Sequence, residues 1–264
     1  MPLHHQNGTT PCAGDLIDWP TNSRDSYTLA NNTVSTVPNA YAAQAMALFS
    51  EIAHWLGQDA DATEWAAAAR TLRGEVAAQL FDHSVGLFRD GRGVQHHAVH
   101  ASIVAAATGM VEEPSIADAV LDGLESTGLF DGRVLTTCWI AGATLEGLYN
   151  LASVSMNGTA AETALRYMSR RGQRSWTSMM DDFNATMTME AWDPADNTGA
   201  QTGGEGITFA HPWCSGPAHV IPQLLMGVSP GDAGWATVAV RPQPGEHGCF
   251  HSTANLLGTF ELLE

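Results

Sequence analysis

Residues 39–57, NAYAAQAMALFSEIAHWLG, and residues 59–82, DADATEWAAAARTLRGEVAAQLFD, decide the fold class of this 264-residue chain. Along the first stretch, apolar side chains recur every three or four residues, which is the spacing of an amphipathic helix. They are Tyr41, Ala45, Leu48, Ile52 and Trp55. Gly57 stands where such a helix would end, and the second stretch begins with acidic residues, which favour a helix N-terminus. The two stretches therefore predict a helical hairpin.

The same pattern recurs along the chain. Residues 96–110 with 113–127, and residues 138–154 with 158–171, predict two more hairpins. A further helix is expected over 215–228, bent at Pro222 because a proline ring removes a backbone hydrogen bond. Successive hairpins joined by long loops predict an all-α fold, a toroid of helical hairpins with its loops gathered at one mouth. A plain helical bundle is the alternative.

The last part of the chain changes character. Residues 235–242, WATVAVRP, alternate like a strand, and residues 250–264, FHSTANLLGTFELLE, predict a β-hairpin. We therefore expect residues 1–230 to form the helical part, with an irregular loop over 1–38, and residues 231–264 to begin a β-domain.

The charge balance excludes several classes of function. The chain has 11 Arg, no Lys and 28 Asp plus Glu, which gives a formal net charge of −17. Such a surface repels nucleic acids and anionic membranes, so neither is expected as a partner. Without lysine there is no Schiff base, no anchor for pyridoxal phosphate and no lysine for a phosphate-binding loop. No cofactor is expected.

Cysteine and histidine give no metal signal. Cys12, Cys138, Cys214 and Cys249 include no Cys-x-x-Cys pair, so we expect ordinary buried thiols. In HHAVH, residues 96–100, two histidines lie one helical turn apart, but no glutamate stands between them as in a zinc protease. No metal site is expected.

The chain also shows no targeting segment. Its N-terminus lacks the features of a signal peptide, and no apolar run reaches the 18 residues of a membrane span. We expect a soluble chain, cytoplasmic or secreted depending on any sequence upstream.

One carboxylate stands out in the long loop after the third hairpin. Glu190 lies in ATMTMEAWDPADN, residues 185–197, where its neighbours are threonines, methionines and a tryptophan. A half-buried carboxyl in such surroundings has a raised pKa and suits a general base. A helix-surface carboxylate is the alternative. Asp193, just before a proline, is expected to cap a turn.

Other loops combine acids with aromatic rings. Asp18 and Trp19 lie in DLIDWPTNSRD, residues 15–25, and His211 lies in FAHPWCSGP, residues 209–217. Carboxylates accept hydrogen bonds from sugar hydroxyls while an indole covers the C–H face of a pyranose ring, so these loops favour sugar recognition. The alternatives are an Asx turn for Asp18 and a helix cap for His211. Trp176, in RSWTSMMDDF, residues 174–183, is a further aromatic next to acids.

Several of these motifs, in this order, resemble inverting α-L-rhamnosidases of bacteria and fungi, from about residue 14 to 258. They are LIDWP, SRDSY, LTTCWIAGATLEGLY, RSWTSMM, ATMTMEAWDP, FAHPWCSGPA and GVSPGDAGWATVAVRPQPG. The combination of MEAWDP, HPW and VRPQPG is the most specific part of the likeness.

The resemblance implies a six-hairpin (α/α)6 toroid followed by a β-sandwich, and hydrolysis of terminal α-L-rhamnosides. It implies that Glu190 is the general base that activates water, and that Asp18, Trp19, Trp139, Trp176 and His211 bind the substrate. The implied partner is a rhamnose-containing glycoside or oligosaccharide.

One departure from the family pattern bears on activity. In those enzymes the general acid lies in an RDE-like segment upstream of the DWP loop, and nothing before Asp15 here is Glu or Arg. The predicted helices are also fewer than a closed toroid of six hairpins requires. We therefore expect a carboxy-terminal portion of a catalytic domain that lacks its acid. The alternatives are a non-catalytic carbohydrate-binding protein and a different (α/α)6 glycosidase.

Overall fold

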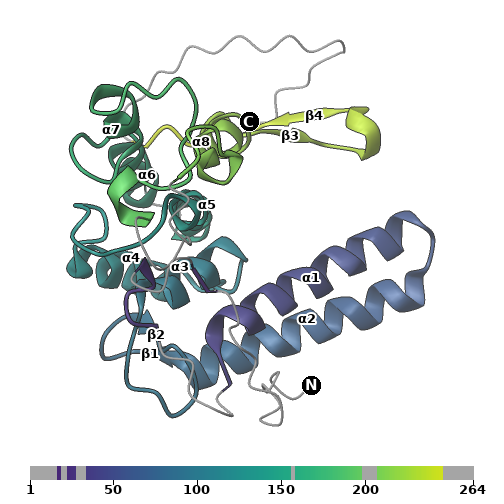
Figure 1. The fold of residues 1–264 in the computed structure, drawn as a ribbon. Coiled ribbons are helices and arrows are strands. Elements are labelled where there is room, and N and C mark those ends of the chain that lie inside the picture. Colours follow the sequence, from purple (N-terminus) through teal and green to yellow (C-terminus); the bar gives the residue numbers. More distant parts are fainter. Residues whose placement is uncertain (1–16, 19–22, 28–33, 156–157, 198–206, 246–264) are drawn as a thin grey trace.

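The computed structural model describes residues 17–18, 23–27, 34–155, 158–197 and 207–245, and its described part is mainly helical (Figure 1). The helices are α1 (Thr36–Trp55), α2 (Asp59–Leu80), α3 (Val99–Ala107), α4 (Pro114–Thr127), α5 (Cys138–Ser155), α6 (Thr159–Met168), α7 (Trp176–Asp181) and α8 (Gly216–Val220). The hairpins predicted from periodicity are therefore confirmed. Helix α4 has Pro114 in its first turn, where the missing N–H of proline costs no helical hydrogen bond.

The helices form two rows, as in part of a toroid. Helix α1 contacts α3, α3 contacts α5, and α5 contacts α8, so these helices lie next to one another. Each of the first three packs against the second helix of its own hairpin, α2, α4 or α6. This is the arrangement of a partial (α/α)6 toroid, which confirms the all-α fold class.

Helix α1 presents an unexpected face to the core. Its buried residues include Ala40, Ala43 and Met46, whereas Leu48 and Trp55 of the predicted apolar stripe are 51% and 68% exposed. Small alanine side chains let a neighbouring helix approach closely, and this gain in packing outweighs burial of the larger stripe on the opposite side. The apolar stripe from which the helix was predicted is therefore exposed, and the opposite face of α1 is buried.

The close approach of α5 and α8 depends on two glycines. A Cβ placed on Gly216, the first residue of α8, would lie 2.5 Å from the Cα of Gly142 in α5. Beyond Val220, α8 continues as a π-helical turn over Ile221–Leu225, which contains Pro222. The helix predicted over 215–228 is therefore α-helical only as far as Val220, and its regular geometry is lost around Pro222.

Two small antiparallel sheets complete the structure. Strand β1 (Phe81–Asp82) pairs with β2 (Leu87–Phe88), with Phe81 opposite Phe88, and β3 (Val228–Pro230) pairs with β4 (Val238–Val240), with Val228 opposite Val240. Strand β4 lies within the strand predicted over 235–242. The hairpin predicted over 250–264 lies outside the described residues, and the domain boundary at 230 stays a prediction.

Sequence reasoning missed the shortest elements. Strands β1 and β2 have two residues each, and α7 has six. Helix α7 begins with a capping box, in which the side chains of Ser175 and Ser178 each bond the backbone N–H of the other residue. The remaining turns are 3-10 helices over Pro194–Asn197, Pro212–Cys214 and Ala233–Trp235.

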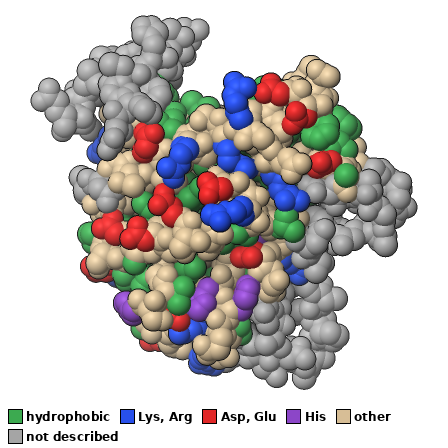
Figure 2. Space-filling view, turned by 90° about the vertical axis from the view of Figure 1, so that its left-hand side faces the viewer, with side chains coloured by type: hydrophobic (Ala, Val, Ile, Leu, Met, Phe, Trp, Pro, Cys, Tyr) green, Lys and Arg blue, Asp and Glu red, His purple; other side chains and the backbone are tan. Residues whose placement is uncertain are grey.

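Acidic and basic side chains lie close together on one face of the molecule (Figure 2). Figure 2 shows a face on which arginine side chains lie among acidic ones. Exposed ion pairs include Arg166 with Glu125 and Arg133 with Asp131. No helix in the described part of the chain is long and apolar enough to span a bilayer.

We predict that Gly216→Ala destabilises the protein by about 1–3 kcal/mol, because the new methyl group meets the backbone of α5. Urea denaturation followed by circular dichroism measures the change. Gly74→Ala is the matched control: it lies within α2, nothing is within 4 Å of its added Cβ, and alanine favours a helix. Equal stability of Gly216→Ala and the unmodified chain would contradict the close contact.

Candidate active site

Glu190 lies in a loop that two backbone hydrogen bonds hold against the segment before η3 (Pro212–Cys214). Its N–H donates to the carbonyl of Thr208 at 3.0 Å, and the N–H of His211 donates to the carbonyl of Thr188 at 2.8 Å. The Glu190 side chain is 22% exposed, so it is half-buried, as predicted for a working carboxylate.

The carboxylate of Glu190 is held by Thr208. Its Oε2 accepts hydrogen bonds from the backbone N–H and from the hydroxyl of Thr208, each at 2.9 Å. The backbone N–H of Thr208 is the largest cause that lowers the pKa of Glu190, and burial opposes it. The Thr208 hydroxyl lowers this pKa further, as does His211 when its imidazole is protonated. The predicted raised pKa is therefore wrong, because hydrogen bonds to the charged form outweigh desolvation.

His211 belongs to the same hydrogen-bonded chain. Its Nδ1 lies 2.8 Å from the Thr208 hydroxyl and 3.8 Å from Oε2 of Glu190. A hydroxyl has one proton, and Thr208 donates it to Glu190, so Nδ1 of His211 must be the donor in the other bond. This fixes the proton on Nδ1 and leaves Nε2 of a neutral imidazole as an acceptor.

The structure tests one of the two interpretations of His211, and its predicted contact with a sugar stays a prediction. The residue precedes η3, but its side chain makes no capping hydrogen bond to that helix, so the capping interpretation is wrong. Thr208, which sequence reasoning missed, joins His211 to Glu190. The only sequence signal for it is a hydroxyl residue three positions before the histidine.

Three groups converge on the backbone carbonyl of Glu190. The indole N–H of Trp213 donates to this oxygen at 2.7 Å. Cys138 and Cys214 form a disulfide, and their sulfur atoms lie 3.5 and 3.7 Å from the same oxygen. The expectation of free buried thiols is therefore wrong for this pair. Cys12 and Cys249 lie outside the described residues.

The disulfide joins two elements of the site. Cys138 begins α5 and Cys214 ends η3, 76 residues later, and both are fully buried. Trp139 follows the first cysteine and Trp213 precedes the second, and both tryptophans line one cavity. The predicted contact of Trp139 with substrate stays a prediction.

Asp18 is buried rather than exposed to a sugar. It is 1% exposed, and its carboxylate accepts from Nε2 of His100 at 2.8 Å, from the backbone N–H of Thr137 at 3.1 Å and from the Thr137 hydroxyl at 2.5 Å. These bonds join Asp18 to α3 and to the start of α5, and its predicted contact with a substrate stays a prediction. The structure gives Asp18 a positioning role at the start of α5. Trp19 lies outside the described residues.

Trp176 contacts two residues that lie close to Glu190, Cys214 and Trp192. Its indole N–H donates to the carbonyl of Cys214 at 2.7 Å, and its ring packs edge-on against Trp192, with centroids 5.1 Å apart. Trp192 is buried and donates to the carbonyl of Thr136 at 3.1 Å. These contacts hold Trp176 in place, and its predicted contact with substrate stays a prediction.

The three histidines of residues 96–100 bond three different carboxylates. His96 bonds Asp90 at 2.8 Å, His97 bonds Asp82 at 3.1 Å, and His100 bonds Asp18. Each imidazole therefore has a structural partner. Asp25, from the same loop as Asp18, accepts from the N–H of Val99, the first residue of α3.

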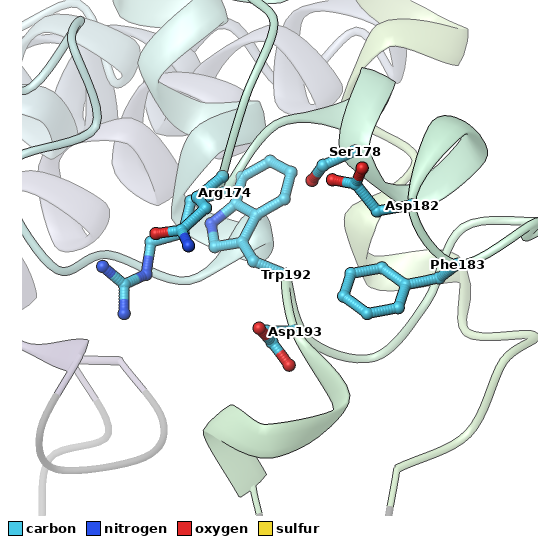
Figure 3. Close-up of a pocket in the computed structure, with 7 residues that line it drawn as sticks. Arg174, Ser178, Asp182, Phe183, Trp192 and Asp193 are labelled. Carbon is cyan, nitrogen blue, oxygen red and sulfur yellow. The ribbon is translucent and has the colours of Figure 1, made fainter.

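A small cavity lies between the side chains of Trp192 and Phe183. Figure 3 shows the rings of Trp192 and Phe183 on opposite sides of it, with Asp182 and Asp193 toward its ends. Its volume is about 120 Å³, well below the 300 Å³ or more of typical small-molecule sites. Asp193 accepts from the N–H of Ala195 at 2.7 Å, which confirms its predicted role as a turn cap.

Comparison with known families identifies the domain. Residues 4–239 match the family model for the bacterial alpha-L-rhamnosidase 6 hairpin glycosidase domain. The chain belongs to this family. The resemblance inferred from its motifs is therefore confirmed. A search of curated proteins gave no match.

Solved rhamnosidase structures share the fold. An α-L-rhamnosidase from Streptomyces avermitilis, complexed with L-rhamnose, matches at 22% identity with a TM-score of 0.59, and one from Aspergillus terreus at 17% identity with a TM-score of 0.59. A GH78-family rhamnosidase from Bacillus sp. GL1 matches at 19% identity with a TM-score of 0.61. Each match covers 87% of this chain but only 20%, 24% and 22% of those proteins, respectively. The chain spans less than a quarter of their length.

We predict that Thr208→Val raises the pKa of Glu190, because the hydroxyl that stabilises the charged carboxylate is lost. Carboxyl ¹³C NMR of the six-hairpin domain measures this pKa, and Thr208→Ser, which keeps the hydroxyl, should leave it low. The lowered pKa also stabilises the fold above the pKa of an unfolded glutamate, and this contribution is lost as pH falls through the folded value. An unchanged pKa in Thr208→Val would contradict the proposed hydrogen-bonded chain.

We predict that removal of the disulfide destabilises the domain. In the chain-entropy model, a crosslink that closes a loop of 76 residues contributes roughly 4.5 kcal/mol. Urea denaturation of the double variant Cys138→Ala/Cys214→Ala should show the loss, and a thiol reductant should lower the midpoint of the unmodified chain but not that of the variant. If the reductant does not change the denaturation midpoint of the unmodified chain, the disulfide is contradicted.

Proposed function

We propose that this chain carries the general base of an inverting hydrolase that acts on terminal α-L-rhamnosides. The observation that carries the proposal is the ionised, half-buried Glu190 in a hydrogen-bonded chain with Thr208 and His211. The match to the rhamnosidase family and the L-rhamnose bound to the Streptomyces avermitilis enzyme support this choice of substrate.

In this mechanism, Glu190 removes a proton from a water molecule as the water attacks the anomeric carbon. A base must be ionised before the reaction, and the lowered pKa of Glu190 meets that condition at neutral pH. The water approaches from the face opposite the leaving oxygen, so the configuration of the sugar inverts.

His211 is placed to bind the sugar or the attacking water. With Nδ1 donating to Thr208, its Nε2 accepts a hydrogen bond from a hydroxyl group. The same chain holds Glu190 in one position, which limits the motion of the base during the reaction.

The reaction also needs a general acid, about 6.5–9.5 Å from the base in inverting enzymes. The motifs of this chain match no such acid, and we propose that it comes from a segment upstream of the DWP loop in a longer protein. An aryl leaving group such as 4-nitrophenolate departs without full protonation, so an aryl rhamnoside reports on the base even where the acid is missing.

We expect Glu190→Gln to slow hydrolysis of 4-nitrophenyl α-L-rhamnopyranoside by roughly 10²–10⁴-fold, because the amide does not accept the proton of water. Release of 4-nitrophenolate measures the rate, and ¹H NMR identifies the first rhamnose anomer, expected to be β. Glu75→Gln, the same change on the exposed face of α2, is the control and should leave the rate unchanged. Release of the α anomer first would disprove inversion, and full activity of Glu190→Gln would disprove the base.

A further inference from the structure

A further cavity lies between the C-terminal end of α1 and the turn that joins β3 to β4, which face each other in Figure 1. Trp55 of α1 and Trp235 of the turn line it from the two sides, and we call it the indole cleft. Its volume is about 660 Å³, within the range of small-molecule sites. The other residues that line it are His54, Pro230, Gly231, Asp232 and Gly234. The cleft therefore shares no described residue with the candidate active site.

Both indoles of the cleft are exposed. Trp55 is 68% exposed and Trp235 is 50% exposed. Because large apolar side chains gain free energy when they leave water, two exposed indoles that line one cavity indicate a binding surface. Trp235 also has a φ of 60°, a backbone conformation that bulky side chains rarely adopt. Such an unfavourable conformation is typical of a residue whose position serves a function.

The charges around the cleft favour a cation. Oδ2 of Asp232 accepts a hydrogen bond from the Thr237 hydroxyl at 2.7 Å, and a carboxylate has capacity for about three more bonds. Helix α1 ends at Trp55, so the negative end of its dipole lies at the cleft. The described residues that line the cleft include no arginine, and the chain has a formal net charge of −17. An anionic ligand is therefore disfavoured.

We propose that the indole cleft binds an organic cation of the quaternary ammonium type. The face of an indole ring is negatively charged and attracts such a cation, whose methyl groups also make apolar contact with the ring. The carboxylate of Asp232 supplies the opposite charge. A neutral ligand of the same shape gains the apolar contact but neither of the two electrostatic contributions. This proposal does not rest on the proposed hydrolysis.

The experiment is an NMR titration of the chain, labelled with ¹⁵N at its tryptophan indoles, with choline and with its neutral isostere 3,3-dimethyl-1-butanol. We expect choline to shift the signals of Trp55 and Trp235 saturably. The signals of Trp139 and Trp213, which line a different cavity, should not move. Choline should bind about tenfold more tightly than the isostere, because only choline interacts electrostatically with the rings. Added sodium chloride should weaken binding of choline but not of the isostere.

The titration is run at pH 8 because His54 also lines the cleft. Its Nδ1 lies 3.8 Å from Oδ1 of Asp59, the first residue of α2. A protonated imidazole repels a cation, and a free histidine is neutral at this pH. The comparison between choline and its isostere then depends on the indoles and on Asp232.

Two variants separate the contribution of charge from that of shape. Asp232→Asn should weaken choline binding roughly threefold, as expected for an exposed ion pair. Asp131→Asn, which removes an exposed carboxylate outside the cleft, is the matched control and should not weaken it. Trp55→Leu keeps an apolar side chain but removes the aromatic face. In this variant, followed at the Trp235 signal, choline should lose its preference over the isostere.

The proposal is overturned if choline shifts neither signal, or if the isostere or methyl α-L-rhamnopyranoside binds as tightly as choline. It is also overturned if choline binds Asp232→Asn as tightly as the unmodified chain, or if Trp55→Leu keeps the preference for choline. Shifts of both signals on dilution of the chain without a ligand would assign the cleft to contacts between copies of the chain, against the proposal. Glu190→Gln, which tests the proposed hydrolysis, should leave choline binding unchanged, so the two proposals succeed or fail separately.

Discussion

The buried carboxylate of Asp18 fixes the start of α5, and the candidate site is built on that position. A charged carboxylate in the interior is very unfavourable unless it is fully hydrogen-bonded, and His100 and Thr137 supply these bonds. Its negative charge also lies at the N-terminus of α5, where the helix dipole stabilises it. The loop at 17–18, helix α3 and helix α5 are therefore held at one point.

Covalent and hydrogen bonds connect the start of α5 to Glu190 and hold the residue in position. Thr137 is followed by Cys138, whose disulfide to Cys214 positions η3, and Trp213 in η3 donates to the backbone of Glu190. In the described part of the chain, the carboxylate of Glu190 accepts its hydrogen bonds from Thr208. Loops give a catalytic group its position only when a rigid scaffold holds them, and here the scaffold is the N-terminal end of α5.

Sequence periodicity predicted what depends on local spacing and missed what depends on distant partners. The helices of the three hairpins follow from apolar residues at helical intervals. The exposure of the apolar stripe of α1 does not follow from periodicity, because the same helix also carries alanines at helical spacing. The approach of neighbouring helices decides which of the two faces is buried. Strands of two residues, such as β1 and β2, carry too few side chains to show an alternation at all.

The candidate site shows the same division. Glu190 and His211 were found from their motifs, but the sign of the pKa shift was wrong, because Thr208 lies 18 residues away in the sequence. Apolar neighbours in sequence suggested desolvation, whereas hydrogen bonds from a distant segment dominate. The pairing of Cys138 with Cys214, across 76 residues, was likewise invisible to spacing rules that look for nearby cysteines.

The low pKa of Glu190 constrains the rest of the reaction. In an inverting hydrolase the two carboxyl groups must differ at one pH, with the base ionised and the acid protonated. Because Thr208 and His211 favour the charged form of Glu190, the general acid of the proposed mechanism is the group that needs a raised pKa. Such an acid needs an apolar or negatively charged environment that desolvates or opposes its charge. Asp18 is buried, and its carboxylate is already hydrogen-bonded to His100 and Thr137. We therefore assign the proton donor of the proposed mechanism to another group.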